Sequence, residues 1–200
     1  MSAIGILLAG GASARFPSGK LDAQIPAELA TLRGRPELAG VRVVDAALSS
    51  LAAAVSEVIV LGEPQLSVAA TKIPDRRPLA GPAASLTDLL AGDLLRQRGD
   101  GTRILILAAD APFAPPSLLG LMAAAGGSLI VREGEPLPLA TSLGALRAAA
   151  SSGEVPRLRD LAKVLAAAPL DARIVSRLDP LGAALADIDT PEDLEAPTTR

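Results

Sequence analysis

The stretch that decides the fold is residues 103–109, RILILAA, which is followed at once by Asp110. After Arg103 the run contains no polar residue, and such runs are typical of a strand that is buried on both faces. A strand of this kind needs helices on both sides of its sheet. We therefore expect residues 103–109 to form a central strand of a helix-covered sheet.

Apolar runs and helical patterns alternate along the rest of the chain, which favours a mostly parallel sheet in one domain over residues 1–200. The first run, Ala3–Ala9, leads directly into Gly10 and Gly11. Residues 21–40 are the least periodic, and we expect them to be a surface excursion near the ligand. The other expected strands are 57–62, 68–73, 128–132, 172–178 and 185–188, and the expected helices are 43–55, 81–96, 115–125, 143–151, 157–168 and one starting at Thr190.

The composition excludes several classes of function. The chain has no Cys and no His, which rules out disulfides, thiolate chemistry and histidine-based catalysis or metal binding. Its net charge of −3 and its 1% aromatic content disfavour a nucleic acid as ligand. No apolar run is long enough to span a bilayer, and the N-terminus lacks the basic start of a signal peptide. We expect a cytoplasmic protein whose chemistry uses carboxylates, Lys, Arg, backbone amides and a hard metal ion.

A glycine-rich stretch, LAGGASARFPSGK at residues 8–20, follows the first expected strand. Glycines let a phosphate approach backbone N–H groups, and Ser13, Arg15 and Lys20 add a hydroxyl and two cations that suit phosphate oxygens. The spacing is neither that of a Walker A loop nor that of a GxGxxG dinucleotide loop. The alternative interpretation is a tight strand-to-helix turn with exposed basic residues.

Two acidic motifs are candidates for a metal site. Asp110 directly ends the strand at residues 103–109, where an ionised carboxylate is costly unless it binds something such as Mg²⁺. Asp187 and Asp189 stand two residues apart, so on a strand their side chains would face the same way. The alternatives are that Asp110 caps the next turn and that Asp189 merely starts the helix at Thr190.

These motifs together resemble the MobA-like nucleotidyltransferases, the molybdenum cofactor guanylyltransferase group. The resemblance rests on LAGGxSxR with a following Lys, on LAADAPF around Asp110, on ADIDTPEDL around Asp189 and on the stretch from Asp75 to Gly81. It implies a Rossmann-like three-layer α/β sandwich of the nucleotide-diphospho-sugar transferase type. It also implies transfer of GMP from GTP, with Mg²⁺, to a phosphorylated acceptor of the molybdopterin type, by a monomer or weak homo-oligomer.

The resemblance assigns roles residue by residue. Catalytic roles fall on Arg15, Lys20 and Asp110, and metal binding falls on Asp110 and Asp189, with Asp187 as a further candidate. Nucleotide contacts are implied for Leu8, Ala9, Gly10, Gly11, Ser13, Arg15, Lys20, Asp75, Gly81 and Asp110, with Asp75 and Gly81 on the guanine side.

The chain departs from the family pattern at several places, one of which is Asp189, where better-known members have Asn, another oxygen ligand. Gly19 stands where the family has Asp, Arg77 replaces a glycine before Gly81, and no Gln precedes Pro138 on the acceptor side. Two alternatives therefore stay open: a cytidylyltransferase or sugar-phosphate nucleotidyltransferase of the same fold, and a non-catalytic or engineered relative that keeps only the nucleotide-binding fold.

Overall fold

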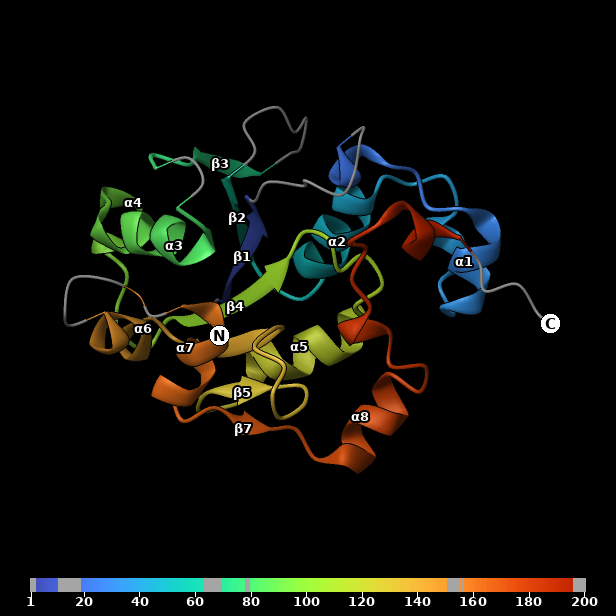
Figure 1. Cartoon of the computed structure of the whole chain (residues 1–200). Helices are drawn as coiled ribbons and strands as arrows, with labels where there is room; N and C mark the ends of the chain where they lie inside the picture. Colours follow the sequence, from blue (N-terminus) through green and yellow to red (C-terminus); the bar gives the residue numbers. More distant parts are fainter. Residues whose placement is uncertain are drawn as a thin grey trace.

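A computed structural model of the chain describes residues 3–10, 19–62, 70–77, 80–150, 155 and 157–195. Its sheet has the strand order β3-β2-β1-β4-β6-β5-β7 (Figure 1). The strands are β1 Ala3–Ala9, β2 Glu57–Gly62, β3 Thr71–Pro74, β4 Arg103–Ala108, β5 Leu129–Ile130, β6 Leu139–Ser142 and β7 Ala168–Pro169.

The inner strand β1 pairs in parallel with β2 on one side and with β4 on the other. β3 extends this parallel half beyond β2, whereas β6 runs antiparallel to both β4 and β5. The prediction of a mostly parallel sheet with residues 103–109 near its middle is therefore confirmed. The carboxyl ends of β1, β2, β3 and β4 consequently share one edge of the sheet, where open α/β folds bind their ligands.

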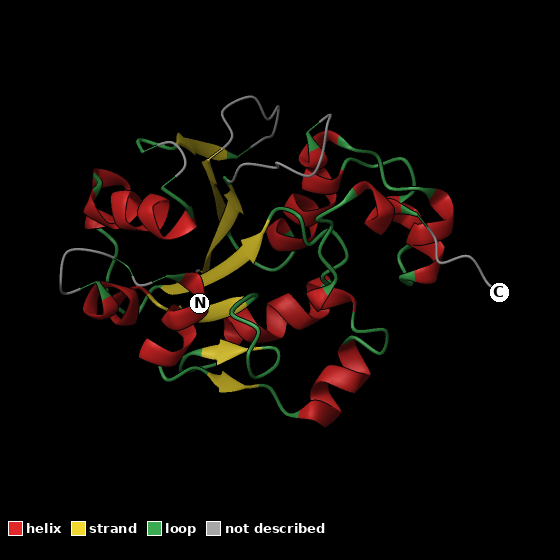
Figure 2. Ribbon diagram, viewed as in Figure 1, coloured by secondary structure: helices red, strands yellow, loops and turns green. Residues whose placement is uncertain are grey.

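Helices cover both faces of the sheet, which gives the expected three-layer α/β sandwich (Figure 2). The helices α2 and α5 pack on one face, and α3, α4, α6 and α7 pack on the other. The bounds of the α-helices are α1 Ala27–Leu32, α2 Val43–Ala52, α3 Pro82–Ala91, α4 Asp93–Arg96, α5 Pro116–Ala124, α6 Leu143–Ala149, α7 Leu158–Val164 and α8 Ala172–Leu178, and those of the 3₁₀ helices are η1 Lys20–Asp22, η2 Pro36–Leu38, η3 Ala183–Leu185 and η4 Pro191–Leu194.

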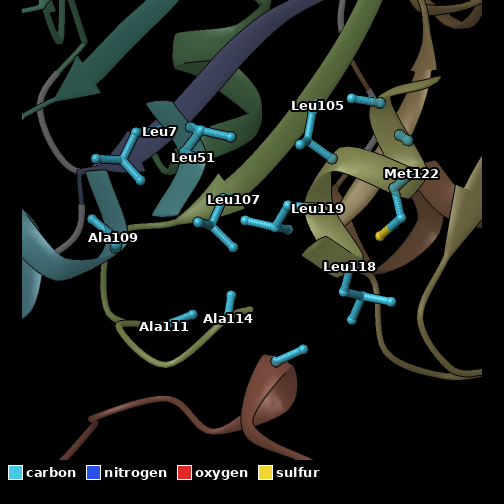
Figure 3. Close-up of a cluster of buried hydrophobic side chains, with 14 of the residues drawn as sticks. Leu7, Leu51, Leu105, Leu107, Ala109, Ala111, Ala114, Leu118, Leu119 and Met122 are labelled. Carbon is cyan, nitrogen blue, oxygen red and sulfur yellow. The ribbon is translucent and has the colours of Figure 1, made fainter. Parts of the chain in front are cut away.

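The two cores follow from the alternation of side chains along the central strands. In β1, Leu7 packs towards α2 and α5, whereas its neighbours Ile6 and Leu8 pack towards α3. In β4, Leu105 and Leu107 likewise join the α2 and α5 side (Figure 3). A strand that serves two apolar layers must be apolar at every position, which explains the uninterrupted run in the sequence.

Several sequence-based expectations differ from the structure. Residues 172–178 were expected to be extended because of Ile174 and Val175, but they form α8. The expected helix at 81–96 is divided at Gly92 into α3 and α4. The short strands β6 and β7 had no counterpart among the expected strands, and β7 begins at residue 168, where the expected helix 157–168 ended. None of the helices that the structure describes is long and apolar enough to cross a membrane.

The segment from residue 21 to residue 40 contains α1 and two 3₁₀ helices, and it is more than a surface loop. Its Ile25 and Leu29 form a third apolar cluster with Phe113, which follows β4, and with Ile188, near the end of the chain. This cluster joins three segments that are distant in sequence next to the carboxyl ends of the strands.

Candidate active site

The carboxyl edge of the sheet brings together residues that the sequence singled out separately. Gly10 follows β1, Asp75 follows β3 and Asp110 lies two residues after β4. The peptide after β4 stays tied to β1, because Ala109 donates its backbone N–H to the carbonyl oxygen of Leu8 at 3.0 Å. The edge therefore places one glycine of the loop between two acidic positions.

Lys20 joins the two predicted metal-binding motifs. Its ammonium Nζ donates to Oδ2 of Asp110 at 2.6 Å and to Oδ1 of Asp189 at 2.9 Å. Lys20 and Asp110 are largely shielded, with side chains 17% and 23% exposed, whereas Asp189 is 51% exposed. A cation at the end of the glycine-rich loop thus lies between carboxylates from two other segments.

The backbone around Asp189 is held from both sides. Ile188 donates its N–H to the carbonyl oxygen of Asp110 at 2.8 Å. The Asp193 carboxylate accepts from the N–H groups of Asp189 at 2.9 Å and Thr190 at 2.7 Å. Asp193 thereby fixes the peptide that carries Asp189.

The segment at residues 185–188 is not a strand of the sheet. The prediction that Asp187 and Asp189 share one face of a strand is therefore wrong in its geometry. The segment leaves the 3₁₀ helix η3, Ala183–Leu185, and its path is set by the contact with Asp110 and by the apolar packing of Ile188. Asp187 nevertheless lies beside Asp110, because both residues line one small cavity.

The protonation of this site follows from burial and from its close charges. Burial lowers the pKa of the Lys20 ammonium, but the hydrogen bonds from Lys20 to Asp110 and Asp189 outweigh this effect and raise the pKa above its ordinary value. Lys20 is therefore a cation at neutral pH. Burial also raises the pKa of the Asp187 carboxyl, and the neighbouring carboxylates of Asp189 and Asp110 raise it further.

The donor set fits a hard divalent cation. Two carboxylates already converge on one cationic group, the Lys20 ammonium, and carboxylate oxygen is the ligand type that Mg²⁺ prefers. Within the described ranges, no three acidic side chains are grouped closely enough to hold a metal ion by themselves. Mg²⁺ commonly uses one or two carboxylates and completes its shell with substrate phosphates and water. The pair formed by Asp110 and Asp189 is suited to that arrangement.

Asp75 lies against the start of the glycine-rich loop. A Cβ atom added to Gly10 would come within 2.6 Å of Oδ2 of Asp75, so a side chain at this position would force Asp75 to move. The other carboxylate oxygen accepts a hydrogen bond from the Ser85 hydroxyl in the first turn of α3. Arg77 points along α3 and pairs with Asp88 at 3.0 Å.

A cavity of about 160 Å³ opens beside Asp110. Its walls combine apolar side chains, including Leu137 and Leu185, with the acidic residues Glu135 and Asp187. The Leu137–Pro138 peptide bond in its wall is cis. Because Asp110 belongs both to this cavity and to the contact with Lys20, a molecule in the cavity would lie next to the candidate metal site.

The structure does not test the predicted roles of several other site residues. Gly11, Ser13 and Arg15 lie outside the described residues. Leu8 and Ala9 are buried in β1 and offer a ligand only their backbone, and Gly81 precedes α3 with a φ of 85°. Their roles in nucleotide binding stay predictions.

Sequence reasoning missed three residues that shape the site: Ser85, Glu135 and Asp193. Asp193 could have been found, because an acid three residues after Thr190 is the pattern of a capping box. Ser85 and Glu135 carried no comparable local signal, since their contacts depend on tertiary folding.

The sequence profile of the MobA-like NTP transferase domain matches residues 5–171. No curated protein shows significant sequence similarity to the chain.

Solved structures share the fold at low sequence identity. Molybdopterin-guanine dinucleotide biosynthesis protein A from Archaeoglobus fulgidus is 18% identical, with a TM-score of 0.65 over 96% of this chain and 94% of that protein. A nucleotidyl transferase from Methanothermobacter thermautotroptrophicus is 20% identical, with a TM-score of 0.62 and the same two coverages, 96% and 94%. A 2-C-methyl-D-erythritol 4-phosphate cytidylyltransferase from Thermus thermophilus is 19% identical, with a TM-score of 0.57 over 97% of this chain and 96% of that one.

Proposed function

The chain belongs to the MobA-like NTP transferase domain family, and from this premise we propose that it transfers GMP from GTP to a phosphorylated small molecule of the molybdopterin type. The observation that carries the proposal is the contact of Lys20 with Asp110 and Asp189. It joins the end of the proposed triphosphate-binding loop to the two carboxylates proposed to hold the metal, and phosphoryl-group transfer requires both parts.

In the proposed reaction, a terminal phosphate oxygen of the acceptor attacks the α-phosphorus of GTP. The bond between the α-phosphorus and its bridging oxygen breaks, and pyrophosphate leaves with the electron pair. Backbone amides of the loop that begins at Gly10, together with Lys20, neutralise the departing phosphates. Asp110 and Asp189 would hold Mg²⁺, which supplies charge neutralisation at the α-phosphate when it is bound. No step requires His or Cys, which the chain lacks.

The cavity beside Asp110 is the proposed acceptor site. It adjoins the carboxylate that would hold the metal, so an acceptor lying there could direct its phosphate towards the α-phosphorus. Glu135 and Asp187 can accept hydrogen bonds from N–H or O–H groups of the acceptor body. Leu137 and Leu185 offer apolar contact to a flat or aliphatic body.

The decisive test measures pyrophosphate release from GTP and Mg²⁺ in the presence of molybdopterin. We expect Asp110→Asn to lower kcat by at least about 100-fold, since it removes a charged metal ligand. Asp93→Asn makes the same change on the exposed surface of α4 and should leave the rate unchanged. If neither wild type nor Asp110→Asn released pyrophosphate with any phosphorylated acceptor, a non-catalytic nucleotide-binding protein would be favoured instead.

A second candidate function is cytidylyl transfer, and the contacts around Asp75 support it. One of its carboxylate oxygens already accepts from Ser85, and Arg77 replaces a family glycine nearby. Guanine recognition by one carboxylate uses both oxygens, whereas cytosine offers a single amino group. Thermal-shift assays with GTP, CTP, UTP and ATP plus Mg²⁺ separate the candidates, and a larger shift with CTP than with GTP would contradict guanylyl transfer.

A further inference from the structure

The Lys20 ammonium occupies a position that suits a metal ion. It lies within hydrogen-bond distance of one oxygen from each carboxylate, at 2.6 Å from Asp110 and 2.9 Å from Asp189. Lys20 lies at the end of the loop that would bind the triphosphate, so its ammonium can donate hydrogen bonds either to phosphate oxygens or to the two carboxylates. A single ammonium cannot serve both sets fully at once, because it has three N–H donors on one atom.

The carboxylate pair does not depend on Lys20 for its position. Asp110 follows β4 and is tied through its carbonyl oxygen to the N–H of Ile188. Asp189 is held by the bond from its own N–H to Asp193. Removing the ammonium should therefore leave the two carboxylates in place, facing one another with no cation between them.

We propose that Lys20 acts as an internal counter-ion that fills the cation position between Asp110 and Asp189 until a nucleoside triphosphate binds and draws the ammonium to its phosphates. The divalent ion then enters with the nucleotide. The inference rests on the proposed function, because it treats the glycine-rich loop as a triphosphate site.

Two consequences follow from this exchange of cations. In the absence of nucleotide, a divalent ion must displace Lys20, so its affinity for the protein is lowered. Because binding free energies are linked, the nucleotide that removes Lys20 raises metal affinity, and the metal raises nucleotide affinity by the same factor. Couplings of this kind are usually about 5-fold to 150-fold.

The test is a titration of nucleotide-free protein with Mn²⁺, in which free Mn²⁺ is measured by electron paramagnetic resonance. We expect Lys20→Met to bind Mn²⁺ at least about fivefold more tightly than wild type. The double variant Lys20→Met with Asp110→Asn should lose this gain. Lys163→Met, which removes an exposed lysine from α7, should bind Mn²⁺ as wild type does. Lys20→Gln repeats the measurement with a polar side chain, and circular dichroism checks the folding of each variant.

The outcomes separate this inference from the proposed function. If folded Lys20→Met and Lys20→Gln bind Mn²⁺ no more tightly than wild type, the Lys20 ammonium does not compete with the metal ion for the two carboxylates. The inference is then overturned. Pyrophosphate release that depends on Asp110 would still stand in that case. If the variants gain the Mn²⁺ site but wild type binds no nucleoside triphosphate, the proposed function fails, and the part of the inference that concerns the nucleotide fails with it.

Discussion

Gly10 lies where two parts of the proposed nucleotide site meet without room for a side chain. A Cβ added to Gly10 would lie 2.6 Å from Oδ2 of Asp75 and 3.5 Å from the Cα of Gly62. A Cβ added to Gly62 would in turn lie 2.4 Å from the backbone nitrogen of Gly10. Moving Asp75 aside would disturb the hydrogen bond that its other oxygen accepts from Ser85. A side chain at position 10 would therefore have to displace Asp75 even before a phosphate is considered.

We predict that Gly10→Ala lowers the free energy of unfolding by about 1–3 kcal/mol, the usual cost of overpacking. The variant should also weaken GTP binding, because it displaces the carboxylate proposed to face the base. Urea unfolding and a nucleotide titration measure the two effects. Gly120→Ala, in α5 with no atom within 4 Å of the new Cβ, is the matched control and should be neutral or stabilising by up to about 1 kcal/mol. Equal stability of Gly10→Ala and wild type would contradict the crowding.

The Asp193 carboxylate gives the C-terminal segment a dependence on pH. Burial raises its pKa, but the hydrogen bonds from Thr190 and Asp189 outweigh burial and hold the pKa below the ordinary value of 3.8. The stabilisation from these bonds is therefore fully present above pH 3.8 and is lost as the pH falls through the lowered pKa.

We predict that Asp193→Ala costs about 1 kcal/mol at pH 7, as the loss of a helix cap does, and that this cost disappears in strong acid. Urea unfolding of wild type and variant in chelator-containing buffers from pH 7 to pH 2 checks the trend. Glu192→Ala removes the adjacent exposed acid and should cost less at every pH. A cost that stays constant as the pH falls would refute the assignment.

At the scale of elements, the site depends on how η3 sets the path towards Asp189. The buried carboxylate of Asp179 accepts from the N–H groups of Ala183 at 2.7 Å and Ala184 at 2.8 Å. These bonds fix the first turn of η3, and η3 in turn delivers Asp187 and Asp189 to the carboxyl edge of the sheet.

We predict that Asp179→Ala lowers the free energy of unfolding by about 2 kcal/mol, because it leaves two buried N–H groups without an acceptor. Asp171→Ala removes an exposed cap from α8, where water can replace the carboxylate, and should cost less than about 1 kcal/mol. Chemical unfolding compares the two variants, and equal costs would mean that the buried cap does not organise η3.

Elements with strong local patterns could be predicted from the sequence, and those set by tertiary contacts could not. β1, β2 and β4 could be predicted because their buried positions face two apolar layers, which gives each strand a nearly continuous apolar run after its first residue. α8 was mistaken for a strand because Ile174 and Val175 favour extended structure, although Arg173 and Arg177 lie one helical turn apart on its exposed side.

The candidate site was predicted in pieces. The chemistry of Lys20, Asp110 and Asp189 could be predicted one residue at a time, from strand ends and glycines. The family resemblance implied that Asp110 and Asp189 share a metal site, but the contact of Lys20 with both was not predicted, because Lys20 is 90 residues from Asp110 and 169 from Asp189. No local pattern encodes such a contact, since it depends on the strand order and on the path of the last segment.

At the scale of the whole molecule, one sheet separates two apolar layers, and every central strand contributes to both. We infer that the two layers unfold together, as expected for one domain over residues 1–200. Leu119 in α5 belongs to the first layer and Ile59 in β2 to the second, and both are fully buried. They lie on opposite faces of the sheet, so their substitutions should act independently.

We predict that Leu119→Ala costs about 2–5 kcal/mol and Ile59→Val about 0.5–1.5 kcal/mol of unfolding free energy, the usual ranges for these core truncations. In the double variant the costs should add to within about 0.5 kcal/mol, with one urea transition and an unchanged denaturant slope. If the layers were separate folding units, each substitution would shift only one of two transitions. A second transition in either single variant would therefore refute a single cooperative domain. It would mean that the two apolar layers do not unfold together.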